Sequence, residues 1–192
     1  MSARDQVLAA VRAAIRDSRS PDVEVPTGYR TSGRIPDPVR LFVERVADYG
    51  AVVRQCSEAE VRGAIGDALA DARTVAVPDG FPYPVEGAEP SDPHTAGAVV
   101  TTAAVGIAST GTVVLDHGPG QGPRLFSLLP DIHVCVVRRD QIVPGVPDAV
   151  ARLDPLRAQT WISGPSATSD IELDRVEGVH GPRTLRVIVV GR

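Results

Sequence analysis

The first half of the chain alternates the patterns of helices and strands, and this alternation constrains the fold more than any other feature. A helix is predicted from Asp37, which precedes a proline, to the glycine stop at Gly50. A short strand follows at 51–55, then a helix that opens with a Ser57–Glu60 capping box, then a strand at 74–77. Such alternation builds parallel sheets with crossover helices. The sequence therefore predicts an α/β fold with a mostly parallel sheet flanked by helices.

The same alternation continues after a proline- and glycine-rich loop at 78–93. Only 4% of the residues are aromatic, so the core is expected to consist of Val, Leu, Ile and Ala, a composition that suits parallel strands. The predicted strands are 97–102, 105–116, 132–138, 160–163 and 185–190, and the predicted short helices are 123–129 and 147–153.

A chain of 192 residues is long enough for one hydrophobic core, and we expect a single domain at 37–192. Residues 1–19 are predicted to hold a separate helix, and the proline- and glycine-rich stretch 20–36 a flexible linker. This first helix can dock on a partner or neighbouring subunit, or fold back onto its own domain. Its narrow apolar stripe consists of Val7, Leu8, Val11 and Ile15.

Composition excludes several classes of function. The chain has no lysine, which rules out a Schiff base, a pyridoxal-phosphate anchor and a Walker-type phosphate lysine. A net charge of −4 without a basic block argues against binding of nucleic acid. Cys56 and Cys135 are isolated and are interpreted as core thiols, so no iron–sulfur cluster or zinc site is expected in this chain. With neither a signal peptide nor an apolar run of spanning length, we expect a cytoplasmic protein without a membrane span.

The first candidate binding loop is Ser109-Thr110-Gly111-Thr112, which offers hydroxyls and a flexible backbone beside an apolar strand. These groups can hold a carboxylate or a phosphate. The structural alternative is a hairpin turn with Gly111 at positive φ.

The second candidate loop runs from Asp116 to Gly122 and leads toward the predicted helix at 123–129. Its glycines Gly120 and Gly122 can present backbone N–H groups to an anion, and Arg124 can complete the pocket through a bidentate contact. The glycine spacing does not match a dinucleotide fingerprint. Arg124 can equally be a solvated residue of the first helical turn.

The third candidate loop follows the strand at 160–163 and contributes Ser163, Gly164, Ser166 and Asp170. In an open α/β sheet, ligands bind at the carboxyl ends of the strands, so these loops are expected to share one edge. The alternative is a helix start capped by Thr168 or Ser169. His180, in a glycine turn, is the candidate for acid–base work or ligand contact, whereas His133 is interpreted as structural. The spacing of these residues predicts no metal site.

Four segments of the second half carry a family resemblance: TGTVVL at 110–115, SLLP at 127–130 followed by HVCVV at 133–137, ISGPSATSDIE at 162–172, and GVHGPR at 178–183. Together they resemble the lactate-utilisation protein C family, the LUD-domain proteins. The resemblance implies a Rossmann-like sheet similar to that of the sugar-phosphate isomerase and CoA-transferase superfamily. One departure stands out, because an acidic residue is common in this family where the present chain has Ser109.

The resemblance also implies a function. Proteins of this family are associated with the oxidation of L-lactate to pyruvate, alongside an iron–sulfur protein and a cysteine-rich partner. The expected role is therefore that of a subunit that supports lactate oxidation and binds a small carboxylate or phosphorylated ligand. Two alternatives stay open: a free-standing enzyme of the isomerase or acyl-CoA-transferase kind, and a ligand-sensing module without turnover. The serine at position 109 weighs against acyl transfer through a glutamyl intermediate.

Overall fold

The computed structural model describes residues 2–16, 28, 33–86, 92–168, 176–177 and 180–191 and divides the chain into two compact units, 1–30 and 31–192. The first unit contains helix α1 (Ala3–Arg16), where Ser2 and Asp5 cap the amino end through hydrogen bonds in both directions. Val7, Val11 and Ile15 recur along it at helical spacing. Most of the predicted linker at 20–36 lies outside the described residues.

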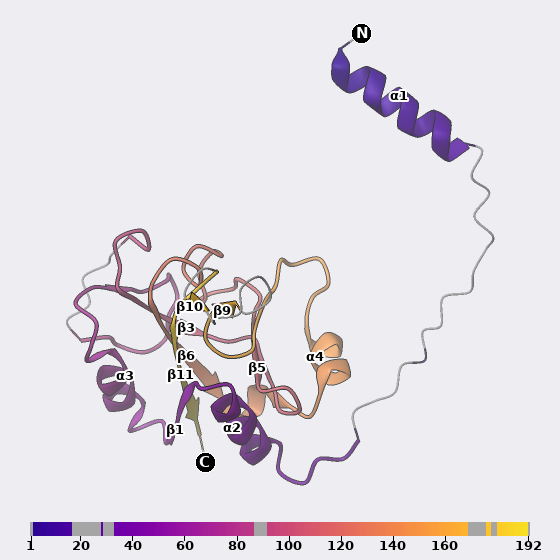
Figure 1. Ribbon diagram of the computed structural model, residues 1–192. Coiled ribbons are helices and arrows are strands. Elements are labelled where there is room, and N and C mark those ends of the chain that lie inside the picture. Colours follow the sequence, from indigo (N-terminus) through magenta and orange to yellow (C-terminus); the bar gives the residue numbers. More distant parts are fainter. Residues whose placement is uncertain are drawn as a thin grey trace. The chain divides into compact units, whose positions relative to one another are not determined.

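The second unit is built on a five-stranded sheet in which every pair of neighbours is parallel (Figure 1). The predicted α/β fold is confirmed. Strand β6 is central, with β11 and β3 on its two sides, and β1 and β2 form the edges of the sheet. In spatial order the strands are β1 (Val52–Cys56), β11 (Thr184–Val190), β6 (Ile132–Arg138), β3 (Ala98–Thr102) and β2 (Val75–Ala76).

One helix packs on each face of this sheet. Successive residues of a strand point to opposite faces, so alternate residues of one strand contact different helices. Leu185, Val187 and Val189 of β11 pack with helix α2 (Pro38–Asp48), whereas Ile188 and Val190 pack with helix α3 (Val61–Leu69). The start of α2 is as predicted, whereas α3 begins at Val61, about one turn after the predicted Ser57 cap. The Asp37 carboxylate accepts from the N–H of Arg40, and Ser57 donates to the carboxylate of Glu60.

A second, four-stranded sheet lies on the α2 side, and the sequence did not predict it. Its order is β7 (Ile142–Val143), β4 (Val105–Ile107), β5 (Thr112–Leu115) and β8 (Thr160–Ile162), and helix α4 (Val146–Arg152) packs against it. The prediction of one strand over 105–116 is wrong, because this segment is the antiparallel hairpin β4–β5. Gly111 forms the turn with a φ of +59°, in agreement with the structural alternative considered for this loop.

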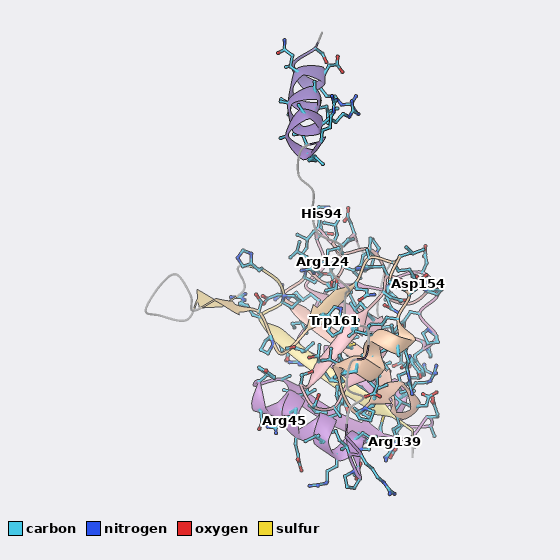
Figure 2. The ribbon with its side chains drawn as sticks, turned by 90° about the vertical axis from the view of Figure 1, so that its right-hand side faces the viewer. Arg45, His94, Arg124, Arg139, Asp154 and Trp161 are labelled. Carbon is cyan, nitrogen blue, oxygen red and sulfur yellow. The ribbon has the colours of Figure 1, made fainter. Side chains whose placement is uncertain are left out.

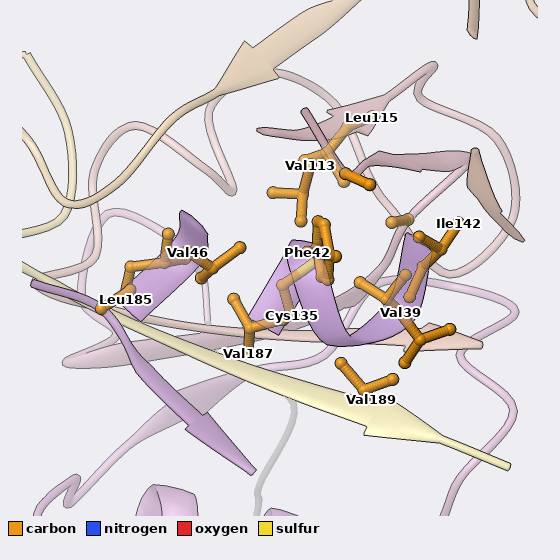
Figure 3. Close-up of a cluster of buried hydrophobic side chains, with 14 residues drawn as sticks. Val39, Phe42, Val46, Val113, Leu115, Cys135, Ile142, Leu185, Val187 and Val189 are labelled. Atoms are coloured by element: carbon orange, nitrogen blue, oxygen red, sulfur yellow. The ribbon is translucent and has the colours of Figure 1, made fainter. Parts of the chain in front are cut away.

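Phe42 of α2 joins the two sheets. Its side chain is fully buried between Val113 and Leu115 of β5 and the strands of the parallel sheet (Figure 3). A Cβ atom on Gly106 would lie 3.2 Å from the Phe42 ring, so the glycine in β4 leaves the space that this ring fills. The α2 face of the domain is therefore one continuous core across both sheets.

One further prediction of local structure is wrong. The segment 123–129 forms turns with bonds such as Phe126 N–H to the Pro123 carbonyl, because so short a run between two prolines gives too few bonds to propagate a helix. The alternative of a helix capped by Thr168 depends on residues outside the described ones; Ala167–Thr168 (β9) pairs with Val176–Glu177 (β10) in an antiparallel ribbon. Ser169, the other proposed cap, lies outside the described residues. A 3₁₀ turn, η1 (Arg139–Gln141), completes the elements.

Candidate functional site

Five of the predicted site residues line one pocket of about 260 Å³, here called the amino-edge pocket. It lies where β6 and β11 begin, at the amino edge of the parallel sheet, since His133 and Leu185 form part of its wall. The predicted residues that line it are Arg124, Ser163, Gly164, Ser166 and His180. The expected position at the carboxyl edge is wrong for this pocket, because β8 belongs to the second sheet and runs antiparallel to its neighbour β5.

Arg124 supplies the positive charge of the amino-edge pocket (Figure 2). Its Nη1 donates to the carbonyl oxygen of Ser127 at 3.1 Å and to the Ser127 hydroxyl at 3.0 Å. Among the residues that the structure describes, no carboxylate forms an ion pair with this guanidinium. An arginine held by neutral acceptors keeps donors for an added anion.

The Ser163 hydroxyl in the pocket wall belongs to a chain of three hydroxyl groups. The Oγ atom of Ser163 lies 2.8 Å from Thr112 Oγ1, which in turn lies 2.7 Å from Thr110 Oγ1. This chain of hydroxyls joins the β4–β5 hairpin to the loop after β8. Two of the three predicted loops are thus connected by hydrogen bonds, through their side chains.

His133 stands at the back of the pocket and is almost fully buried. Its Nε2 lies 2.8 Å from the Thr101 hydroxyl, as expected for a structural histidine. Burial lowers the pKa of His133, and together with the smaller effect of the nearby Arg124 charge brings it to about 4. The imidazole is therefore neutral near pH 7 and adds no second positive charge to the pocket.

Residues 180–182 form another part of the pocket wall. The backbone N–H of His180 donates to the Ser166 hydroxyl at 3.3 Å, and the N–H of Ser166 donates to the Pro182 carbonyl at 2.8 Å. His180 is exposed at the rim. An imidazole, two serine hydroxyls and a guanidinium thus surround a space that suits a small anion carrying a hydroxyl or carbonyl group.

The comparisons with known proteins agree with this fold. Residues 93–190 match the family model of the LUD domain. The chain is 46% identical to Lactate utilization protein C of Deinococcus radiodurans, with 98% of this chain and 96% of that protein covered. The chain belongs to the LUD-domain family. The resemblance predicted from its motifs is confirmed.

A second relative and a solved structure are also similar to this chain. Lactate utilization protein C of Geobacillus sp. is 35% identical over 99 residues, which are 47% of this chain and 41% of that protein. The crystal structure of a DUF162 family protein from Deinococcus radiodurans, 42% identical, aligns with a TM-score of 0.65 over 80% of this chain and 96% of that one.

Several predicted residues of this LUD-domain chain lie away from the amino-edge pocket. Ser109 and Thr110 line a separate hollow with Arg45 and Tyr49 at the end of α2, so the Ser109 position is not part of the pocket wall. Gly111 packs against the Arg45 backbone, where a Cβ would lie 2.6 Å from the Arg45 carbonyl carbon. Asp170 lies outside the described residues.

The glycine loop after β5 is divided between the two edges of the sheet. Gly120 packs over the end of β3, where its carbonyl accepts from the N–H of Thr102 at 2.8 Å. Gly122 accepts a bond at 2.9 Å from His117 Nδ1, and His117 Nε2 lies 3.1 Å from Thr160 Oγ1 in the pocket wall. His117 has a φ of +57°, which a non-glycine residue rarely adopts. No signal in the sequence indicated that this histidine links the glycine loop to the pocket wall through these two hydrogen bonds.

The two cysteines occupy opposite faces of the parallel sheet. Cys135 packs on the α2 side and Cys56 on the α3 side. Burial raises the pKa of both thiols, to about 12 for Cys135, so both are protonated near neutral pH.

Within the described ranges, no three His, Cys, Asp or Glu side chains gather as metal ligands. The described helices include none that is long and apolar enough to cross a membrane.

Proposed function

We propose that this protein takes part in lactate utilisation and that its amino-edge pocket binds a small 2-hydroxy or 2-oxo carboxylate such as L-lactate or pyruvate. The observation that carries the proposal is Arg124, which faces the pocket without an ion-pair partner among the described residues. The names of the relatives, Lactate utilization protein C, support the pathway. The volume of about 260 Å³ supports a ligand of few atoms, because pockets for drug-sized molecules are usually larger.

In the proposed complex, the charged and the uncharged side chains of the pocket bind different groups of the ligand. The Arg124 guanidinium pairs with the carboxylate, since its planar fork matches the two oxygens. The hydroxyls of Ser163 and Ser166 and the His180 imidazole then bond the 2-hydroxyl or 2-oxo group. His180 is the candidate base for the hydroxyl proton, because it is the exposed histidine of this rim.

The electron acceptor is assigned to partner proteins, an iron–sulfur subunit and a cysteine-rich subunit, with the complex in the cytoplasm. Oxidation of lactate releases two electrons and two protons, so a redox group must receive the electrons. The protonated thiols of Cys56 and Cys135, buried on opposite faces of the sheet, support this assignment, because a cluster needs thiolate ligands that converge.

The isolated chain is expected to lack stoichiometric iron, flavin or zinc and to show no oxidation of L-lactate with an artificial electron acceptor. The chain combined with its iron–sulfur and cysteine-rich partners is expected to reduce the acceptor. Metal analysis, an absorbance spectrum and dye reduction with each subset of subunits measure this. Robust turnover by the isolated chain contradicts the subunit role, whereas an inactive full set contradicts the pathway.

Arg124→Ala is expected to weaken binding of L-lactate or pyruvate at least about tenfold, because hydrogen bonds to charged groups contribute about 1.5–3 kcal/mol. The free energy of unfolding is expected to change by less than about 0.5 kcal/mol, as for other exposed positions. Calorimetric titration and thermal unfolding of the same samples measure both quantities.

Arg40→Ala is the matched control for Arg124→Ala. Arg40 is an exposed arginine on α2 that pairs with Glu44, outside the pocket. Its removal is expected to leave binding unchanged. If wild-type protein binds neither lactate nor pyruvate at millimolar concentration, or if Arg124→Ala binds them undiminished, the amino-edge pocket is not the carboxylate site.

A further inference from the structure

A larger cavity opens at the opposite edge of the parallel sheet, and the proposed lactate site does not use it. This carboxyl-edge cavity has a volume of about 610 Å³ and lies where β3 and β6 end, at Thr102 and Arg138. In open α/β sheets, ligands bind in the crevice outside the carboxyl ends of the strands. Figure 2 places Arg139, the residue after β6, well apart from Arg124 of the amino-edge pocket.

Three arginines line the cavity, whereas Asp116 is its single carboxylate among the described residues. Arg138 comes from the end of β6, Arg152 from the end of α4, and Arg157 from the loop that follows. They gather in a chain whose formal net charge is −4. The topology thus collects positive charge from distant segments at one edge of an acidic protein.

The contacts of these arginines position them without using all their donors. Arg138 forms a bidentate pair with Asp140 at 3.0 Å, and Arg152 Nη1 donates to the Asp140 carbonyl at 3.0 Å. Arg157 Nε donates to the Asp116 carbonyl at 3.1 Å and lies 3.4 Å from its carboxylate. Each guanidinium has five N–H groups, so donors are left for a ligand after these bonds between described residues.

The glycine loop after β5 forms the wall beside Arg157. A Cβ atom on Gly118 would lie 3.2 Å from Arg157 Nη2, so glycine keeps this approach open. The N–H of Gly120 donates to the Asp79 carbonyl at 2.8 Å, which fixes the loop over the turn after β2. Tyr83 and Pro119 add an apolar surface that can contact the carbon skeleton of a ligand.

We propose that the carboxyl-edge cavity binds a small metabolite that carries two or more anionic groups, phosphate or carboxylate, with Arg152 and Arg157 as the binding residues. Two guanidinium groups from different segments suit a ligand whose charges are separated. A ligand with one carboxylate, such as lactate, satisfies only one of them. The cavity is thus a second site with a different ligand from that of the amino-edge pocket.

The test is calorimetric titration of the full chain with pyrophosphate, citrate and acetate. Pyrophosphate or citrate is expected to bind more tightly than acetate. Arg152→Ala and Arg157→Ala are each expected to weaken that binding at least about fivefold, as for loss of a charge-assisted contact. Arg40→Ala is expected to leave it unchanged. The ratio of pyrophosphate to citrate affinity tells a phosphate ligand from a carboxylate ligand.

Three results would overturn this proposal: no binding of pyrophosphate or citrate at millimolar concentration, acetate binding as tightly as either, or undiminished binding by both arginine variants. Arg157 also bonds the Asp116 backbone, so thermal unfolding checks that its variant is folded. If the Arg157→Ala variant is unfolded, the binding measured with Arg152→Ala tests the proposal, because Arg152 bonds the Asp140 carbonyl in an exposed turn. The lactate site is tested separately through Arg124, so either site can fail alone.

Discussion

Phe42→Ala is expected to lower the free energy of unfolding by about 3–5 kcal/mol, the usual cost of removing a buried aromatic ring. The loss is expected at the high end of the range, because the ring contacts both sheets and the cavity cannot close from one side alone. Urea unfolding followed by circular dichroism measures it. Secondary structure at zero denaturant confirms that the variant is folded before the two curves are compared.

Val52→Ala is the control for this substitution. Val52 lies on the edge strand β1 with 61% of its surface exposed, so truncation is expected to change stability by less than about 0.5 kcal/mol. A loss at Phe42 no greater than the loss at Val52 would contradict the role of the ring as the link between the two sheets.

Acidification from pH 6.5 to pH 4 is expected to destabilise the protein by about 3 kcal/mol through His133 alone. Above pH 6.5 the imidazole is neutral in both the folded and the unfolded chain, so it contributes no pH dependence. Below pH 6.5 the unfolded chain takes up a proton, whereas the folded chain does so only near pH 4. Stability is therefore lost as the pH falls through this window, and it levels off below it.

The measurement is the free energy of unfolding at several pH values for wild type and His133→Gln. Glutamine keeps a hydrogen-bonding group for the Thr101 hydroxyl and removes the titration, so the variant is expected to show a shallower slope between pH 4 and 6.5. Identical slopes for wild type and His133→Gln would show that His133 does not titrate differently in the two states.

Local patterns predicted the parallel sheet well. The apolar run 132–138 became β6 with the same bounds, since a fully buried central strand is apolar on both faces. The second sheet was missed because β4 and β5 read as one apolar strand across Gly111. The turn there depends on close packing against Arg45, a contact between residues 66 positions apart that periodicity does not encode.

The sequence predicted part of the candidate site from local patterns. Arg124, Ser163, Ser166 and His180 were found because each lies in a loop with polar side chains beside a predicted strand, and the structure places them around one pocket. Whether they bind a ligand stays a prediction. For the carboxyl-edge cavity, the sequence indicated one wall, the loop from Asp116 to Gly122, but not the arginines, which lie in segments that only the completed fold brings together.

The glycines on either side of the Thr112–Ser163 hydrogen bond both rest on the end of α2. Gly111 contacts the Arg45 backbone, and a Cβ on Gly164 would lie 2.7 Å from Tyr49 Cβ. The matched LUD segment begins only at residue 93, so α2 and strand β1 lie outside it. A fragment cut at that boundary would lose Phe42, both edge strands of the parallel sheet and the surface on which both loops rest. The unit that can be expressed, transplanted or recombined with its pocket intact therefore begins before α2.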